Sequence, residues 1–104
     1  MLWAAGDAFR DRVEGSLQSV RKSLGEERSK QIELPRDRIF SGVDCVDKVL
    51  ASGIDVILLA TPPGFRPMQI ERAVEKGVHV FAEKPVASDA PGVRRVLEAC
   101  KKAQ

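Results

Sequence analysis

The sequence has few of the residues that build metal, disulfide and nucleic-acid sites. It contains one histidine and two cysteines, and Cys45 and Cys100 lie 55 positions apart rather than in a C-x-x-C pair. This supply argues against a metal site and a disulfide scaffold, and it fits a reduced, cytoplasmic protein. Aromatic residues make up 5% of the chain, and its 17 basic and 15 acidic residues are mixed along it. A nucleic-acid-binding surface concentrates cations and stacking aromatics, so no nucleic-acid partner is expected.

Long apolar runs and closely spaced glycines are also missing. The longest apolar stretch lies around Val56–Ala60 and is far too short to span a bilayer, so no membrane partner is expected. The N-terminus lacks the basic region and apolar segment of a signal peptide. The two nearest glycines, Gly6 and Gly15, are nine positions apart. No G-x-G-x-x-G loop is therefore present to hold a pyrophosphate at a helix N-terminus.

What the sequence does contain is an alternation of strand and helix signals. Apolar residues recur at helical spacing from Phe9 to Leu24, and Gly25 is placed to end that helix. Residues 54–60 form an almost unbroken β-rich run, which is typical of a central parallel strand covered on both faces. In the first half of the chain we expect a strand at 1–5, a helix over 9–24, a loop over 26–38, a very short strand at 39–40, and a helix that begins at residue 44 and ends at 53. In the second half we expect a strand at 54–60, a helix that includes 68–74 and ends at 77, a strand at 78–82, and a last helix capped by residue 88 or 89.

This alternation predicts an α/β fold in which a parallel sheet is wrapped by crossover helices. The length of 104 residues leaves room for one domain, over residues 1–104. The last helix carries Pro91 in its first turn, where proline costs little. Its buried face is expected to consist of Val93, Val96, Leu97 and Cys100.

Three predicted strand ends carry residues suited to a ligand, because doubly wound sheets bind ligands beyond the carboxyl ends of their strands. Asp7 follows the first strand, where a carboxylate either accepts both ribose hydroxyls of an adenosine or caps the next helix. Position alone leaves both roles open. Thr61-Pro62-Pro63 follows the run at 54–60 and forms either an ordinary turn or a rigid apolar shelf beneath a nicotinamide or pyrophosphate.

The third strand end is Glu83-Lys84-Pro85, after the strand at 78–82. A lysine held between an acid and a proline can orient a cofactor or polarise an alcohol, although a lone lysine is more often a surface residue. His79 is expected to alternate outward on its strand or to be satisfied in the packing. Arg66 and Arg72 flank the helix after the Thr-Pro-Pro turn, and we expect both to lie in solvent.

Two segments together resemble one known family. Residues 55–63 (DVILLATPP) and 77–85 (GVHVFAEKP) are similar, in content and in separation, to the "ATP" turn and the G-K-H-V-x-x-E-K-P strand of the Gfo/Idh/MocA oxidoreductases. With Asp7 and the closing helix added, the resemblance covers nearly the whole chain. Two positions depart from the family pattern, since Val78 replaces the usual lysine and Arg66 stands where many members have histidine. The run at 64–67 (GFRP) nevertheless resembles one branch of the family.

The resemblance implies a partial Rossmann-type doubly wound parallel sheet that lacks the first βα unit and the C-terminal substrate domain. It also implies an NAD(P)-dependent oxidoreductase of sugars, cyclitols or related polyols, whose partners are a nicotinamide cofactor and a sugar-like substrate. Carried over by position, Asp7 binds the adenosine ribose. Its charge is expected to repel a 2′-phosphate and so to favour NAD over NADP, although Arg10, one turn later, could offset this repulsion. The remaining cofactor-binding candidates are Ala60, Thr61, Pro62, Glu83, Lys84 and Pro85. Lys84, which contacts nicotinamide and substrate in the family, is the catalytic candidate.

The missing first strand has a physical consequence, because it is central in the strand order 3-2-1-4-5-6. Its neighbours lose backbone partners, and each buried unpaired group costs about 1–3 kcal/mol. The flanking strands then pair with each other, the chain borrows a strand by association through its unpaired edges, or it folds poorly. We therefore expect the chain alone to be inactive. The alternative function is a non-catalytic α/β interaction module whose exposed sheet edge binds a partner chain by strand addition.

Overall fold

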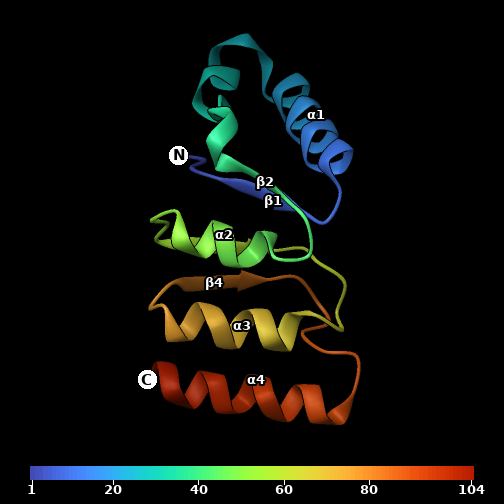
Figure 1. Cartoon of the computed structure of the whole chain (residues 1–104), viewed down its shortest axis with the longest axis vertical. Helices are drawn as coiled ribbons and strands as arrows, with labels where there is room; N and C mark the ends of the chain where they lie inside the picture. Colours follow the sequence, from blue (N-terminus) through green and yellow to red (C-terminus); the bar gives the residue numbers. More distant parts are fainter. The chain divides into compact units, whose positions relative to one another are not determined.

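Strands and helices alternate through residues 1–104, all of which the computed structural model describes, in two units comprising residues 1–54 and 55–104 (Figure 1). The first unit contains β1 (Ala5–Asp7), α1 (Arg10–Ser29), the 3-10 turns η1 (Lys30–Ile32) and η2 (Arg36–Arg38), β2 (Ile39–Ser41) and α2 (Cys45–Ala51). The second contains β3 (Val56–Leu59), α3 (Arg66–Glu75), β4 (His79–Ala82) and α4 (Ala90–Ala103). This order confirms the predicted α/β class.

The first unit is built on a parallel pair, in which Ala5 of β1 lies opposite Ile39 of β2 and Asp7 opposite Ser41. The predicted strand at 1–5 is therefore displaced toward Asp7. Helix α2 approaches β1 closely at Gly6, where a Cβ atom would lie 3.0 Å from Cγ2 of Val49. The apolar core of this unit is formed by Val13, Leu17, Ile32, Cys45 and Leu50. Glycine at position 6 thus allows α2 to pack closely on the strand that ends at Asp7.

Helix α1 ends its regular course at Gly25, whose φ of 74° is left-handed, as the sequence predicted. The chain then resumes helical geometry to Ser29 and makes two 3-10 turns, so the prediction of a loop over 26–38 was wrong for much of that segment. The segment is polar, but glutamate, arginine and lysine are good helix formers and do not need a buried face to adopt helical turns. Val20 and Leu24 are exposed, and only Val13 and Leu17 are buried on α1.

The second unit has its strands β3 and β4 paired in parallel, with Leu58 opposite Phe81 and Leu59 opposite Ala82. Helix α3 contacts both strands, whereas α4 packs mainly on α3, so one face of the sheet receives the helices (Figure 1). Ile57 and Leu59 are buried, but Leu58 on the opposite face is 70% exposed. The prediction that this strand is covered on both faces was therefore wrong for this unit.

Helix α4 begins at a true cap, since Oδ1 of Asp89 accepts a hydrogen bond from the amide of Gly92 at 2.7 Å. At Gly92 a Cβ atom would lie 3.1 Å from Cγ of Pro67 on α3, so this helix pair meets through small residues. The residues of α4 that are buried are Gly92, Val96 and Ala99, while Val93, Leu97 and Cys100 are exposed. The predicted buried face of α4 was thus right only for Val96. The close approach of α3 and α4 leaves room mainly for small side chains such as Gly92 and Ala99.

An ion pair links the two helices of the second unit, where the guanidinium of Arg95 on α4 donates two hydrogen bonds to the carboxylate of Glu71 on α3. Hydrogen bonding by Arg95 lowers the pKa of Glu71. Because the folded-state pKa lies below the usual value, the pair stabilises the fold above about pH 4.3 and is lost as pH falls through the lowered pKa.

We expect Glu71→Gln to lower the melting temperature by about 1–3 °C at pH 7, the scale of an exposed ion pair. The difference from the parent chain should vanish on acidification below the pKa of Glu71, because the parent carboxyl is then also neutral. Thermal unfolding followed by circular dichroism between pH 2 and pH 7 measures it. Glu98→Gln, which removes a pair within α4 to Lys101, is the matched control. A pH-independent difference would contradict the expectation.

Candidate functional site

The two motifs of the second unit meet at one edge of its sheet. Since β3 and β4 are parallel neighbours, their carboxyl ends lie together, and the amide of Glu83 donates to the carbonyl of Leu59 at 2.9 Å. Ala60, Thr61 and Pro62 follow β3 at this edge, and Glu83, Lys84 and Pro85 follow β4. Six of the seven predicted site residues are thereby placed side by side, at the position where doubly wound sheets bind ligands.

Lys84 combines a held backbone with a free side chain. Its amide donates to Oε2 of Glu83 at 3.1 Å, and the peptide bond to Pro85 is cis. The Lys84 residue is exposed, and no hydrogen bond or ion pair to its ammonium group is found. The lysine therefore presents an unneutralised charge beside the turn that follows β3.

Arg66 holds the backbone on both sides of Lys84. Its Nη1 donates to the carbonyl oxygen of Glu83 at 2.8 Å and to that of Pro85 at 2.6 Å. Arg66 is only 5% exposed, so the prediction that it lies in solvent was wrong. The missed signal was its spacing, because Arg66 falls four residues before buried Ile70 and seven before buried Ala73 on the inner stripe of α3. Arg72 on the same helix is half-buried.

A second side chain of α3 holds the turn after β3. The hydroxyl of Thr61 donates to Oε1 of Gln69, and Gln69 is 7% exposed. No motif in the sequence includes Gln69, although its position three residues after Arg66 puts both side chains on one face of the helix. Both strand-end turns are therefore hydrogen-bonded to the same helix.

Asp7 lies at the end of β1 in the first unit and is half-buried. Its Oδ1 accepts a hydrogen bond from the amide of Phe9 at 3.0 Å, whereas Phe9 itself is the N-cap of α1. The carboxylate thus closes the turn that leads into the helix and does not bond to the first helical turn. Burial, followed by the nearby charge of Asp7, raises the pKa of the Cys45 thiol, which keeps that buried cysteine unreactive.

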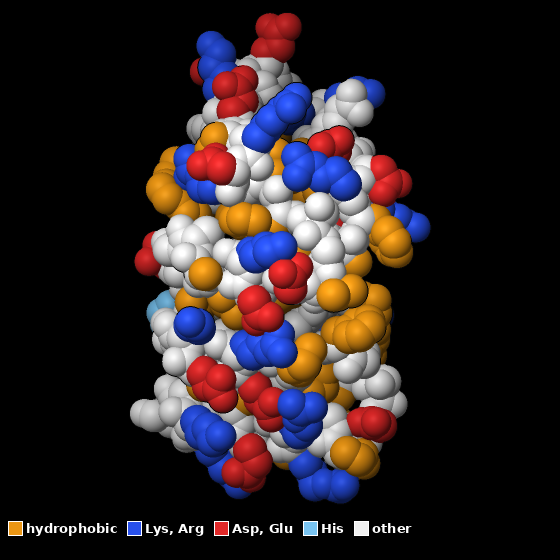
Figure 2. Space-filling model, viewed as in Figure 1, with side chains coloured by type: hydrophobic (Ala, Val, Ile, Leu, Met, Phe, Trp, Pro, Cys, Tyr) orange, Lys and Arg blue, Asp and Glu red, His pale blue; other side chains and the backbone are white.

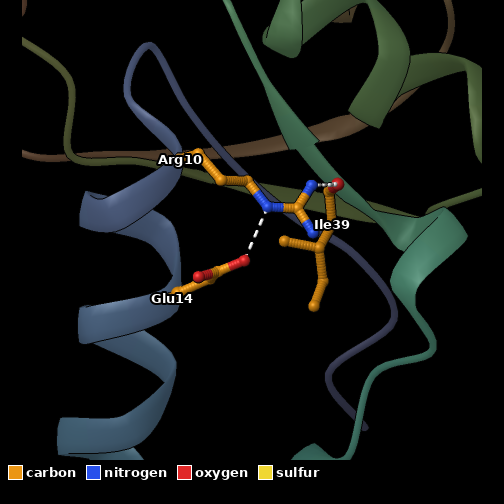
Figure 3. Close-up of polar contacts among 3 residues, drawn as sticks. All are labelled: Arg10, Glu14 and Ile39. Carbon is orange, nitrogen blue, oxygen red and sulfur yellow. Dashed lines mark hydrogen bonds and ion pairs between the residues drawn. The ribbon is translucent and has the colours of Figure 1, made fainter.

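The guanidinium of Arg10, the cation nearest to Asp7 in sequence, is hydrogen-bonded to two other residues (Figure 3). Its Nε donates to Oε1 of Glu14 at 2.7 Å, and its Nη1 donates to the carbonyl of Ile39 at 3.0 Å. The guanidinium is therefore paired with a carboxylate one turn along α1 and anchored to β2.

A shallow hollow opens at the opposite end of β4 from Lys84. It is lined by residues that include Val74, Val78, His79 and Cys100. His79 is exposed on its strand, which is the first of the two alternatives expected for it. Lysine, arginine, aspartate and glutamate side chains are interspersed over the face seen in Figure 2. None of the helices has the length and hydropathy that crossing a membrane requires.

The strand-end arrangement agrees with the comparison to known families. Residues 8–104 match Gfo/Idh/MocA, the oxidoreductase family with an NAD-binding Rossmann fold. The chain belongs to this family. The predicted recognition is thereby confirmed from residue 8 onward, and with it the oxidoreductase and NAD-binding character of the family.

Similar proteins include two inositol 2-dehydrogenases. The one from Leifsonia xyli subsp. xyli is 34% identical over 64 residues, covering 62% of this chain and 18% of that protein. The one from Rhodococcus erythropolis is 27% identical over 95 residues, covering 89% of this chain and 27% of that protein. The chain thus spans a minor part of the length of these relatives.

Among solved structures, the WlbA dehydrogenase of Bordetella pertussis in complex with NADH and UDP-GlcNAcA shares the fold. Its TM-score is 0.61 at 22% identity, and the similarity covers 97% of this chain and 34% of that chain. The predicted partial Rossmann fold is therefore confirmed. Within the first unit β1 pairs with β2, and within the second unit β3 pairs with β4.

Proposed function

We propose that this chain supplies the cofactor-binding segment of an NAD-dependent oxidoreductase that acts on sugars, cyclitols or related polyols. The observation that carries the proposal is the adjacency of the turns at residues 60–62 and 83–85 at one edge of the β3–β4 sheet. Ligands of such sheets bind beyond the carboxyl ends of the strands. The inositol 2-dehydrogenases and the complex of WlbA with NADH and UDP-GlcNAcA support the choice of cofactor and substrate class.

The residues present fit a nicotinamide cofactor at this edge. The rigid Thr61-Pro62 turn offers an apolar shelf for a ring, with Ala60 exposed before it. The Lys84 ammonium, free of protein partners, would lie where negative charge develops on a substrate oxygen. A nicotinamide ring bound here would supply hydride transfer as its chemistry. Glu83 and Pro85 would hold the lysine's backbone, and Asp7 would accept the adenosine ribose hydroxyls.

The test is to titrate the 15N-labelled chain with NADH into the millimolar range and follow its amide signals by NMR. We expect saturable shifts at Thr61, Glu83 and Lys84 from the nicotinamide half and at Asp7 from the adenosine half. Adenosine monophosphate is the control ligand, because it should move only the Asp7 signals. The proposal fails if none of these four amides shifts saturably with NADH.

Cofactor choice gives a second prediction, because the Asp7 carboxylate repels a 2′-phosphate while Arg10 is already paired with Glu14. Asp7→Ser should raise the affinity for NADPH relative to NADH by about tenfold, which is about 1.4 kcal/mol. The ratio of the two dissociation constants is obtained from parallel NMR titrations. Asp11→Ser, which removes an exposed carboxylate of α1, is the matched control. An unchanged ratio in Asp7→Ser would mean that Asp7 serves only the turn to Phe9.

A specific observation favours one other function, the interaction module. Each sheet has two strands, so within its own unit each strand has one edge without a strand partner. On the face of the second sheet away from the helices, Val56, Leu58 and Phe81 are 53%, 70% and 64% exposed. Exposed edges with apolar side chains are templates for strand addition. A molecular mass that rises with concentration in sedimentation, together with no response to NADH, would favour this reading over the first.

A further inference from the structure

We infer that Arg66 is a positioning residue, which sets the backbone of residues 83–85 and thereby the place where Lys84 presents its ammonium group. The inference rests on the proposed function, because it assigns Arg66 to the same strand-end site. Arg66 acts here through the turn that carries Lys84 and is assigned no contact with cofactor or substrate.

The contacts bracket Lys84 from both sides. One nitrogen, Nη1 of Arg66, donates to the carbonyl of Glu83 at 2.8 Å and to the carbonyl of Pro85 at 2.6 Å. Hydrogen bonds from a guanidinium are charge-assisted, so they are shorter and stronger than neutral ones. Neither carbonyl can rotate without breaking such a bond. The peptide unit that joins Glu83 to Lys84, and the one that follows Pro85, are therefore each held in one orientation.

Because Arg66 is buried, its guanidinium and the turn at residues 83–85 depend strongly on each other. Arg66 is 5% exposed and forms no ion pair with a carboxylate, and its Nε has no partner. Taking a guanidinium out of water is unfavourable unless fixed acceptors replace its hydration. The acceptors available are the carbonyl groups of the turn. The guanidinium therefore depends on the turn conformation as much as the turn depends on the guanidinium.

Gln69 ties the turn after β3 to α3 in the same way that Arg66 ties the turn after β4. It lies about one turn further along α3, is 7% exposed, and accepts a hydrogen bond from the Thr61 hydroxyl. The turn after β3 and the turn after β4 are thus both tied to α3. Their separation, and with it the distance from the Thr61-Pro62 shelf to Lys84, is then governed by the geometry of one rigid helix.

The chemistry favours arginine at this position. A guanidinium stays charged when buried, whereas a buried lysine shifts its pKa readily and loses charge. A neutral imidazole has a single N–H to donate. Arg66→His can therefore satisfy one of the two carbonyls, Arg66→Lys keeps an amine of different reach, and Arg66→Met keeps apolar bulk without a donor.

The experiment compares the 15N-labelled parent chain with Arg66→Met, Arg66→His and Arg66→Lys. Arg94→Met is the matched control, since Arg94 is exposed and no hydrogen bond or ion pair of its side chain is found. We expect the Lys84 backbone order parameter to fall from about 0.85 in the parent to below about 0.6 in Arg66→Met, with intermediate values for the other two variants. The NADH-induced shifts at Glu83 and Lys84 should be lost in Arg66→Met while the shift at Asp7 persists.

Each outcome either supports or overturns the positioning role of Arg66. A dispersed spectrum of Arg66→Met with an unchanged order parameter and unchanged NADH shifts at Glu83 and Lys84 overturns the inference. If Arg66→Met does not fold, Arg66→His and Arg66→Lys are judged by the same two signals, and parent-like values in both overturn it. If the parent chain shows no NADH response at all, the proposed function fails by itself. The positioning role then stands or falls on the Lys84 order parameter alone.

Discussion

The 104-residue chain should bind NADH with a dissociation constant no tighter than about 1 mM, which corresponds to about 4 kcal/mol of binding free energy. The sequence contains no G-x-G-x-x-G loop, so the helix N-terminus that holds a pyrophosphate in Rossmann folds is not supplied. Two or three charge-assisted hydrogen bonds at about 1.5–3 kcal/mol each are forgone. Isothermal titration calorimetry measures the constant, and a micromolar value would contradict the expectation.

The same reasoning predicts a gain when the loop is added. A fusion that places a strand, a G-x-G-x-x-G turn and a helix ahead of Met1 should tighten NADH binding toward the micromolar range, a change of about 4 kcal/mol. Replacing the second glycine of the added loop by valine is the control, because a side chain there prevents the backbone from approaching the pyrophosphate. Equal affinity of the fusion and its valine variant would show that the phosphate loop does not limit binding.

Strand and helix types could be predicted from the sequence because each rests on a local period. The run at 54–60 and the helical spacing of 68–74 correspond to β3 and α3. Gly25 and Gly77 both have the positive φ that glycine adopts readily where a helix is interrupted or ends. What could not be predicted was which faces are covered. Leu58 is exposed because both helices of its unit lie on the other side, and that is a property of topology that no single segment encodes.

In the candidate site, too, some residues could be predicted from local motifs and others could not. Thr61 and Lys84 were found from motifs, and parallel pairing of β3 with β4 suffices to bring them to one edge. Arg66 was assigned to solvent because arginine usually lies there, yet it falls on the buried stripe of α3 with Ile70. Its acceptors are backbone carbonyls 17 and 19 residues away, and a carbonyl leaves no trace in sequence composition. A polar residue at a buried position of a helix therefore indicates a side chain that binds fixed backbone groups.

Lys84 provides the second prediction of large effect. Removing its ammonium should lower turnover by about 10²–10³-fold, the scale of a lost electrostatic donor at a developing charge. Affinity for the cofactor should change much less, because most of its binding free energy comes from the adenosine and pyrophosphate ends. Lys84 is exposed and its ammonium has no protein partner, so Lys84→Ala and Lys84→Met should alter stability by no more than about 0.5 kcal/mol.

Turnover is best measured in a chimera in which this chain replaces the matching segment of the Rhodococcus erythropolis inositol 2-dehydrogenase, of which it covers 27%. Both Lys84 variants are assayed at saturating NAD, so that a change in kcat is separated from a change in cofactor binding. Lys76→Met is the matched control, since Lys76 is exposed at the end of α3, away from the strand-end turns. If both Lys84 variants fold and turn over like the parent chimera, the lysine is a surface residue and the catalytic assignment is wrong. A loss confined to the Lys84 variants assigns the effect to the charge at this strand end, because neither the fold nor a lysine elsewhere accounts for it.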